Sequence, residues 1–475
     1  MTVMITKEQF MMRKQQGKTF LVIQEEEGDS LTPIALYRRM KGEKKFLLES
    51  SQLHQDKGRY SYLGSNPYGE IKSIGKEVEI TINGMTEKVN GNVLKELERI
   101  LAPSKVDSPF PFCGGAVGYI GYDVIRQYED IGEMLSDPLN IPEIHVLLYR
   151  MFVVYDHVRQ KLSFVYVYQG NDTDSYEEVY EQLQVYKQEL LHESEEHMKE
   201  LCASLSFTSS VTEARFYEMV EQAKEHIRAG DIFQVVLSQR LQSDFAGNPF
   251  ALYRRLRTAN PSPYMFYIDF QDYVVLGSSP ESLLSVRDEK VMTNPIAGTR
   301  PRGKTKEEDE KIAQELLANE KERAEHMMLV DLGRNDIGRV SEIGSVQLDK
   351  YMKIEKYSHV MHIVSEVSGT LRKNTNCFDA LAYCLPAGTV SGAPKIRAME
   401  IINELETEKR NVYAGAVGYI SFSGNMDMAL AIRTMVVKDE KAYVQAGAGI
   451  VYDSNPVAEY EETLNKAKAL LEVMK

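Results

Sequence analysis

The 475-residue chain contains no tryptophan and only four cysteines, Cys113, Cys202, Cys377 and Cys384. Four unevenly spaced cysteines are too few for the disulfide framework that stabilises small secreted proteins. No Cys-x-x-Cys pair occurs, so the usual sequence sign of structural zinc is also missing. The cysteines therefore indicate reduced thiols, and we expect a cytoplasmic protein.

The sequence also lacks long apolar runs and blocks of basic residues. A membrane-spanning helix needs about 18 or more apolar residues in succession, and no segment provides them. Residues 1–17 lack the continuous apolar stretch of a signal peptide. With a net charge of −14 and no run of Lys and Arg, the chain does not show the positive patch of a nucleic-acid-binding protein. Small molecules and other proteins remain as the expected partners.

The overall composition is that of a globular protein, with 43% apolar and 27% charged residues. Because a single hydrophobic core stops growing at about 250–300 residues, we predict two domains, 1–205 and 206–475. The boundary follows a charged helical pattern over 174–201 and lies in the polar stretch 202–210. The N-terminal third mixes helical and strand patterns, with many strands.

Several local patterns predict individual elements. The apolar runs at 144–156 and 161–168 predict a buried hairpin. Ser210 and Glu213 form a capping-box pattern, which predicts a helix that Gly230 ends. The second predicted domain begins with this helix.

Two sets of carboxylates share a helical spacing. Glu322 and Glu325 are three residues apart, and Glu459, Glu462 and Lys466 fall at i, i+3 and i+7. Each set lies on one face if its segment is helical. Two carboxylate faces across a cleft would bind a hard divalent cation and leave positions for water and substrate. Glutamates at this spacing are also common on solvated helices, so spacing alone leaves both interpretations open.

Glycines and an arginine near the C-terminus indicate a possible anion site. Gly447 and Gly449 lie in a predicted strand region, 442–456, next to a second one, 415–437, that contains Arg433. Backbone N–H groups beside glycine are open to an anion, and a guanidinium fork matches a carboxylate. Close packing of strands, with the arginine paired to a core acid, would explain the same residues.

His362 and Glu281 are candidates for proton transfer. A histidine in an apolar strand is often a core residue, and a glutamate after Ser-Ser-Pro suits the first turn of a helix, so neither is decisive. The glycines of segment 386–406 suggest a phosphate loop. Since the Gly-x-x-x-x-Gly-Lys-Ser/Thr order is absent, we exclude an ATP site.

Six segments carry a family resemblance: PIAGTRPRG (295–303), ERAEHMMLVDLGRND (322–336), PAGTVSGAPK (386–395), YAGAVGY (413–419), AIRT (431–434) and EYEETLNKA (459–467). In this order they resemble the chorismate-utilising enzymes, densely over about residues 210–475. The resemblance implies an α+β fold of two packed antiparallel sheets with helices outside and the active site between them. It also implies a smaller N-terminal regulatory domain interleaved with this fold.

The resemblance assigns roles to individual residues. It implies Mg²⁺ ligands at Glu325 and Glu462, with Glu322 and Glu459 as supporting acids. The implied catalytic residues are Glu281, which protonates the departing C4 hydroxyl of chorismate, His362, which removes the C2 proton, and Thr389. The implied substrate-binding residues are Gly298, Thr299, Tyr413, Arg433, Gly447, Gly449 and Lys466.

Two positions separate the branches of this family. Members that add water, forming isochorismate or salicylate, carry a lysine immediately before a Val-Val-Leu strand, where this chain has Gln234. Members that form 4-amino-4-deoxychorismate carry a lysine where this chain has Ala297. The resemblance therefore implies direct attack of ammonia at C2 and anthranilate as the product. Aminodeoxychorismate formation is the nearest alternative, and a non-catalytic chorismate or tryptophan sensor is an alternative of another class.

The expected source of ammonia is a separate protein. No segment shows the Gly-x-Cys-x-Gly nucleophile turn of a glutamine amidotransferase. The resemblance therefore implies a partner amidotransferase subunit that hydrolyses glutamine.

Two further segments suggest regulation by the pathway's end product. LLES at 47–50 and NPSPYMFY at 260–267 are similar to the segments that form the tryptophan pocket of feedback-inhibited members. A strand end and a Pro-Ser-Pro turn would explain the same residues. The implied effector-binding residues are Glu49, Ser50, Pro263, Tyr264 and Met265.

Overall fold

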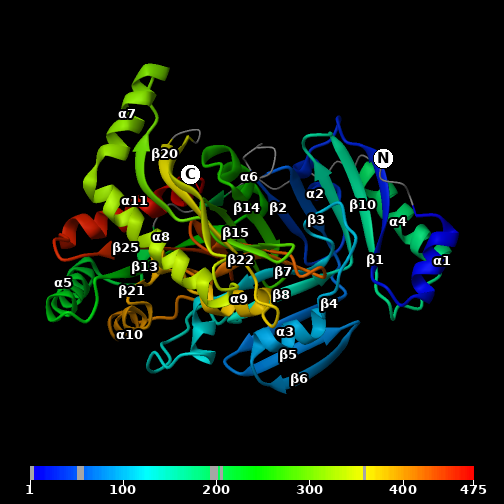
Figure 1. The fold of residues 1–475 in the computed structure, drawn as a ribbon, viewed down its shortest axis with the longest axis horizontal. Coiled ribbons are helices and arrows are strands. Elements are labelled where there is room, and N and C mark those ends of the chain that lie inside the picture. The colour runs from blue at the N-terminus through cyan, green and yellow to red at the C-terminus, as the bar shows by residue number, and fades with distance from the viewer. Residues whose placement is uncertain (1–4, 51–57, 193–201, 204–206, 357–359, 475) are drawn as a thin grey trace.

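The computed structural model describes residues 5–50, 58–192, 202–203, 207–356 and 360–474. Two large β-sheets form its centre, and their strands pair in antiparallel fashion (Figure 1). The predicted α+β class with two antiparallel sheets is therefore confirmed.

In the first sheet, the main path of the described strands runs β1 (Phe20–Glu27), β10 (Lys161–Tyr168), β9 (Met151–Asp156), β3 (Tyr60–Gly64), β2 (Phe46–Glu49), β14 (Tyr264–Asp269), β15 (Tyr273–Ser279), β24 (Thr434–Lys438), β25 (Lys441–Ile450), β13 (Gln234–Ala246) and β11 (Cys202–Ala203). The short strands β12 (Thr208–Ser209) and β21 (Gly392–Ala393) also pair with β13.

In the second sheet, the path runs β18 (Ile296–Pro301), β20 (Val360–Thr370), β17 (Lys290–Thr293), β16 (Ser282–Arg287), β23 (Met426–Leu430), β22 (Ala416–Ser421), β7 (Gly115–Ile120), β8 (Ile144–Tyr149), β4 (Gly69–Ile74), β5 (Glu77–Ile82) and β6 (Met85–Asn90). β19 (Gln347–Lys356) pairs with β20.

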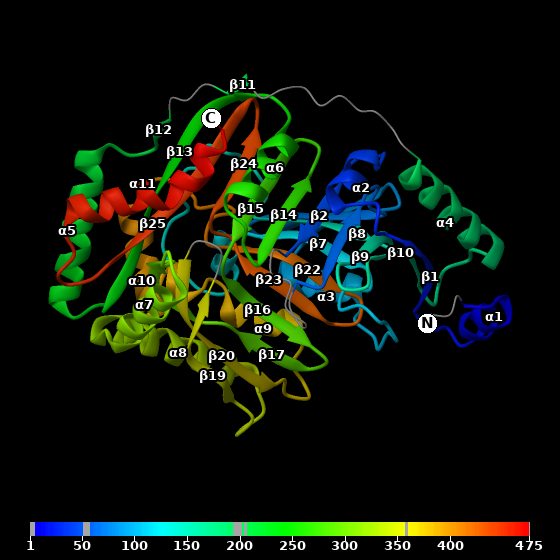
Figure 2. The ribbon, with the colours of Figure 1, turned by 90° about the horizontal axis from the view of Figure 1, so that it is seen from above.

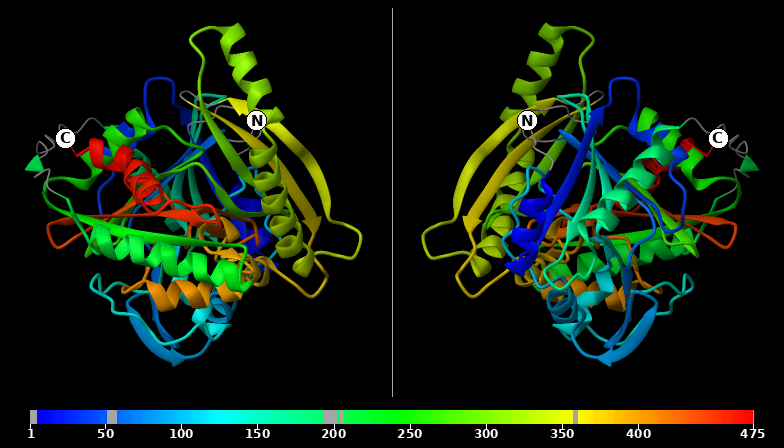
Figure 3. Two further views of the ribbon diagram at one scale, coloured as in Figure 1. Left: turned by 90° about the vertical axis from the view of Figure 1, so that its left-hand side faces the viewer. Right: turned by 90° about the vertical axis from the view of Figure 1, so that its right-hand side faces the viewer.

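Helices lie on the outer faces of this pair of sheets (Figure 2). α5 (Glu213–Ala229) and α11 (Pro456–Glu472) accompany β13 and β25, whereas α7 (Lys306–Ala318) and α8 (Glu320–Val340) accompany β18, β19 and β20. α7 projects from the body of the molecule (Figure 3). The other helical segments are α1 (Lys7–Gln15), α2 (Pro33–Arg39), α3 (Val93–Leu101), η1 (Tyr122–Gln127), α4 (Tyr176–Leu191), α6 (Pro249–Ala259), α9 (Cys377–Cys384), η2 (Gly388–Val390) and α10 (Lys395–Leu405).

Strand β14 shows how the first sheet is buried on both faces. Phe266 and Ile268 belong to the apolar core that includes the second sheet. Met265 and Tyr267 belong to a different core, formed with α1, α2, α4, α6 and α11. Since successive side chains of a strand face opposite sides, a strand covered on both faces is apolar at nearly every position. Because both faces of the first sheet are packed, the sheet holds the loops that follow its strands in defined positions.

Three local expectations need correction. The helix predicted from Ser210 is capped by Thr212, whose hydroxyl accepts the N–H of Arg215, and it begins at Glu213. The run 144–156 is not one strand, because it breaks at Arg150 into β8 and β9, which belong to different sheets. Only its second half forms the predicted hairpin, with β10.

Both sheets contain strands from before and after the predicted domain boundary. In the first sheet β2 pairs with β14, and in the second β7 pairs with β22. The boundary itself, between residues 205 and 206, lies outside the described residues, and the division at this point stays a prediction. None of the helices in the described ranges combines the length and apolar character that crossing a bilayer requires.

Candidate active site

A cavity of about 880 Å³ lies between the two sheets, where the resemblance places the active site. β13 and β25 of the first sheet form one wall, and β18 and β20 of the second form the opposite wall. α8 packs on β18 and β20, and α11 packs on β25. Each sheet therefore brings one carboxylate-bearing helix to the rim of the cavity.

The residues predicted for metal, substrate and catalysis all line this cavity. They are Glu281, Gly298, Thr299, Glu322, Glu325, His362, Thr389, Tyr413, Arg433, Gly447, Gly449, Glu459, Glu462 and Lys466. Gln234 and Ala297, which separate the family branches, line it as well. The predicted effector residues lie elsewhere in the described chain.

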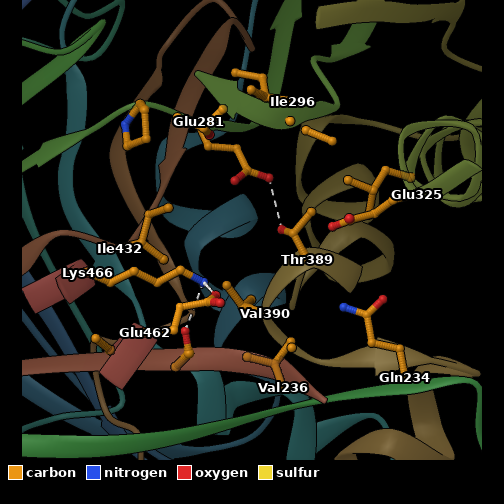
Figure 4. Close-up of a pocket in the computed structure, with 18 of the residues that line it drawn as sticks. Gln234, Val236, Glu281, Ile296, Glu325, Thr389, Val390, Ile432, Glu462 and Lys466 are labelled. Atoms are coloured by element: carbon orange, nitrogen blue, oxygen red, sulfur yellow. Dashed lines mark hydrogen bonds and ion pairs between the residues drawn. The ribbon is translucent and has the colours of Figure 1, made fainter. Parts of the chain in front are cut away.

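Glu281 follows the end of β15 and points across the cavity toward Thr389 (Figure 4). The Thr389 hydroxyl donates to Glu281 Oε1 over 2.9 Å. Burial raises the pKa of Glu281 to about 7, against the opposing effects of Thr389, Lys466 and Arg433. A carboxyl group with this pKa holds a proton in much of the protein near neutral pH and can act as a general acid.

His362 lies in β20 opposite Thr299 of β18. Its Nδ1 is 3.1 Å from the carbonyl oxygen of Gly298 and 3.1 Å from the Thr299 hydroxyl. Since a carbonyl can only accept, Nδ1 carries the proton and the neutral ring has its lone pair on Nε2. Burial lowers the pKa of His362, which favours this neutral form. The ring is therefore suited to accept a proton.

Four glutamates line the cavity, two from α8 and two from α11. Burial, together with the charges of Glu322 and Glu462, raises the pKa of Glu325. Burial also raises the pKa of Glu459, where Glu462 again adds a like charge. Lys466 lies 2.7 Å from Glu462 and also donates to the carbonyl oxygen of Gly447. The mutual repulsion marks a place where a cation would be stabilised.

The carboxylates fit a partly open Mg²⁺ site. Among the described residues, no three His, Cys, Asp or Glu side chains come close enough to enclose a metal ion. Mg²⁺ is commonly bound by one or two carboxylates, with water and substrate oxygens completing its shell. Glu325 on α8 and Glu462 on α11 both line the cavity, and the charge of Glu462 contributes to the raised pKa of Glu325, so these two carboxylates are the candidate pair.

The cavity lining also includes an arginine and two glycines that could offer donors to an anion. Arg433 has a positive φ of 48°, a strained backbone conformation that is found at functional sites. A Cβ on Gly447 would lie 2.7 Å from the Tyr413 hydroxyl, and one on Gly449 would lie 2.7 Å from Gln234 Nε2. At Gly447, where the Leu237 carbonyl oxygen also lies 2.8 Å from the added Cβ, a side chain would require the backbone to shift, so glycine is favoured there.

The effector segments predicted from sequence come together in the structure. β2 and β14 are paired so that Glu49 lies opposite Met265. Glu49 is buried, and its carboxylate accepts hydrogen bonds from Tyr253 at 2.7 Å and from Arg257 Nε at 3.0 Å. This region therefore contains a buried carboxylate, at the end of β2, that accepts hydrogen bonds from two side chains.

The same strand connects this region with the cavity. Tyr264, the first residue of β14, pairs with Ser279 of β15. The Ser279 hydroxyl accepts the backbone N–H of Glu281 over 3.3 Å. The predicted effector segment on β14 is therefore connected to Glu281 through a single pair of neighbouring strands, β14 and β15.

Sequence reasoning missed one cation that lines the cavity, Lys321, and one that pairs with a cavity-lining glutamate, Arg300. Arg300 Nη1 lies 2.9 Å from Glu322, which restrains one of the supporting acids. Lys321 lines the cavity and precedes Glu325 by four residues, so helical spacing could have indicated it. Arg300 lies in the segment PIAGTRPRG, but nothing in its spacing relates it to α8.

The chain is similar to known proteins over nearly its whole length. The family model described as chorismate binding enzyme matches residues 43–472. Anthranilate synthase component 1 of Lactococcus lactis is 46% identical over 460 residues, covering 95% of this chain and 99% of that protein. Its counterpart in Acetivibrio thermocellus is 48% identical, covering 94% and 93%. The crystal structure of anthranilate synthase component I from Streptococcus pneumoniae TIGR4 matches with a TM-score of 0.81 and 45% identity, covering 94% and 98%.

Proposed function

The chain belongs to the chorismate-binding enzyme family, among the anthranilate synthase component 1 proteins, and we propose that it converts chorismate and ammonia to anthranilate and pyruvate. This is a lyase reaction and the first step of tryptophan biosynthesis. The observation that carries the proposal is a buried acid, Glu281, and a neutral base, His362, that line one cavity together with Arg433 and the carboxylates of α8 and α11.

In the proposed first step, ammonia forms a bond to C2 of chorismate and the C4 hydroxyl departs. Hydroxide is a poor leaving group, so Glu281 donates its proton and the group leaves as water. Thr389 holds the Glu281 carboxyl in place and stabilises the carboxylate that results. Gln234 and Ala297 supply neither a base for water nor an amine nucleophile, which leaves ammonia as the nucleophile.

In the proposed second step, His362 removes the proton from C2. The bond between C3 and the enolpyruvyl oxygen breaks, the ring becomes aromatic, and the enolate takes up a proton to give pyruvate. Deprotonation at Nε2 of a neutral imidazole is consistent with the Nδ1 contact to Gly298. Arg433 and the backbone donors at Gly447 and Gly449 bind the enolpyruvyl carboxylate, together with Tyr413.

Glu325 and Glu462 would hold Mg²⁺, and Lys466 would assist in binding the ring carboxylate of chorismate. When bound, the cation supplies positive charge for that carboxylate. Glu322 and Glu459 add negative charge around the ligands.

The partner requirement provides the direct test of this function. We expect the isolated chain to form anthranilate from chorismate with ammonium and Mg²⁺, but not with glutamine, because it carries no amidotransferase nucleophile. Anthranilate fluorescence measures the product. Addition of the amidotransferase subunit should enable glutamine to serve as the nitrogen source. Glutamine-dependent turnover by the pure chain, or no anthranilate with ammonium, would contradict the proposal.

Feedback inhibition by tryptophan is the second part of the proposal. Because the chain contains no tryptophan, the fluorescence of added tryptophan reports only the ligand. We expect Ser50→Phe to fill the space beside Glu49 and weaken tryptophan inhibition at least about tenfold, a loss of roughly 1.4 kcal/mol in binding, without lowering the uninhibited rate.

Ser30→Phe, on an exposed turn, is the matched control and should leave inhibition unchanged. Measurement of the inhibition constant and of tryptophan binding by fluorescence tests the prediction. Unaltered inhibition in Ser50→Phe would show that the effector pocket lies elsewhere.

A further inference from the structure

Arg410 lies behind the wall of the cavity and makes contact with three of its segments. Its Nη1 donates to the carbonyl oxygen of Val390 over 2.7 Å, and its Nη2 donates to that of Val236 over 2.7 Å. Its guanidinium also lies over the ring of Tyr413, 5.6 Å from the centroid. Val236, Val390 and Tyr413 all line the cavity, whereas Arg410 does not.

Glu406 fixes the orientation of this guanidinium. Glu406, four residues before Arg410 in sequence, accepts from Nε over 2.9 Å and from Nη2 over 2.6 Å. Glu406 Oε1 also accepts the backbone N–H and the hydroxyl of Ser238 in β13, each over 2.8 Å. A planar fork held on both edges has little rotational freedom. The distance between β13 and the η2 turn is therefore set by one rigid group.

The η2 turn carries a side chain that acts on the reaction. Thr389 immediately precedes Val390, and its hydroxyl donates to Glu281. Figure 4 shows Val390 and Val236 on the same side of the cavity, with the Thr389 hydroxyl reaching toward Glu281. A shift of the Val390 carbonyl would therefore move the hydroxyl relative to the acid.

From these contacts we infer that Arg410, oriented by Glu406, is a positioning residue that holds Thr389 against Glu281 and fixes the Val236 and Tyr413 walls around the substrate. This inference rests on the proposed function. A misplacement of about 1 Å in such a wall can lower the rate on the order of 100-fold. Removal of one partner of a buried ion pair is strongly destabilising, so the test keeps a positive charge at position 410.

A neighbouring ion pair offers a matched control. Lys409 and Glu143 form a buried pair at 2.9 Å, with exposed side-chain fractions of 5% and 2%. Arg410 and Glu406 are similarly buried, at 1% and 5%. The two basic residues are adjacent in sequence, but neither Lys409 nor Glu143 lines the cavity.

The test compares two substitutions that conserve charge, Arg410→Lys and Lys409→Arg. A lysine at 410 keeps a positive charge beside Glu406 but cannot reach both carbonyl oxygens with a fixed fork. We expect Arg410→Lys to lower kcat with ammonium about 30-fold or more, in line with the cost of misplaced groups. Lys409→Arg should stay within about twofold of wild type in kcat, since neither Lys409 nor Glu143 lines the cavity.

The pH profile separates positioning from a general loss of structure. The charged groups that act on Glu281 are Lys466 and Arg433, and neither is changed in these variants. The Thr389 hydrogen bond lowers the pKa of Glu281, so loss of its alignment should raise the alkaline pKa of kcat/KM. Thr389→Val should give the same upward shift, and combining it with Arg410→Lys should add little to the loss of kcat. The profile is measured at a constant concentration of neutral ammonia.

Each outcome decides between the two proposals. If wild type and Lys409→Arg form no anthranilate, the proposed function fails. If they do and Arg410→Lys matches them in kcat and alkaline pKa, the function stands and the positioning role is wrong. If Arg410→Lys fails to fold, the double variant Arg410→Met with Glu406→Gln takes its place in the comparison, because it removes both buried charges together. If neither variant folds while Lys409→Arg does, Arg410 is a structural residue and the inference is overturned.

Discussion

Replacement of either Glu325 or Glu462 by glutamine should lower the rate of anthranilate formation about 1,000-fold. Each substitution removes one negative ligand from the carboxylate pair that would hold Mg²⁺. A bound metal contributes several kcal/mol of electrostatic stabilisation, and each 1.36 kcal/mol corresponds to about a factor of ten in rate. Steady-state turnover of chorismate with ammonium, measured over a range of Mg²⁺ concentrations, tests this effect.

Glu461→Gln is the matched control, since Glu461 lies next to Glu462 on α11 but does not line the cavity. It should retain the wild-type rate. Rates near wild type in Glu325→Gln and Glu462→Gln would show that these residues do not hold the metal.

Thermal unfolding gives a second readout that does not depend on activity. Because burial and the neighbouring glutamates raise the pKa of Glu325, its ionised form destabilises the folded protein above the carboxyl's ordinary pKa. Without Mg²⁺ at neutral pH, Glu325→Gln should therefore unfold at the same temperature as wild type or higher. Added Mg²⁺ should raise the unfolding temperature of wild type more than that of the variant. A ligand stabilises the folded state only to the extent that it binds, and the variant is expected to bind Mg²⁺ less tightly.

Replacement of Glu281 by glutamine should lower the rate of anthranilate formation by between about 100-fold and 10,000-fold, the range expected for loss of a general acid. Glutamine keeps the size of the side chain and can still bond to Thr389, but it has no acidic proton to give to the departing hydroxyl. Product formation with ammonium, under saturating Mg²⁺, measures the loss.

The pH dependence of wild type should identify the same group. Glu281 acts in its protonated form and has a pKa of about 7, so activity should fall as pH rises through this value. His362 acts in its neutral form, and its lowered pKa places the acidic fall in activity below the ordinary histidine range. The fall at low pH and the fall at high pH should both appear when kcat/KM is measured against pH with the concentration of neutral ammonia held constant. Persistence of the fall at high pH in Glu281→Gln would assign that fall to another group.

The fold class and the cavity-lining residues were predicted through the family resemblance, which rests on six motifs that are each local in sequence. Glu325 and Glu462 could be paired only through the resemblance, since their helices lie far apart in sequence and spacing within each helix says nothing about the distance between helices. The break of 144–156 at Arg150 was missed because an apolar run does not reveal which of two sheets each half will join. Thr212 was missed as a cap because Ser210, two residues earlier, has Glu213 at the capping-box spacing, whereas Thr212 has Arg215 there.

Arg410 shows a further limit of sequence reasoning. Arg410 and Glu406 have the i, i+4 spacing of a surface pair on a helix. In the structure they are buried, and Arg410 reaches Val236, which is 174 residues away in sequence. Neither hydrophobic periodicity nor capping patterns predict such a contact, because it depends on how β13 is placed by the rest of the sheet.

The order of strands in the two sheets also bears on how the chain is assembled during synthesis. β24 and β25 lie between β15 and β13 in the first sheet, and β22 and β23 lie between β7 and β16 in the second. These central strands come from residues 416–450. Until that part of the chain has left the ribosome, the strands on either side of them in each sheet cannot be joined into one sheet. During this time the nascent chain exposes unpaired strand edges that can associate with other chains. Translation speed near the end of the message and the supply of chaperones therefore influence the yield of folded protein.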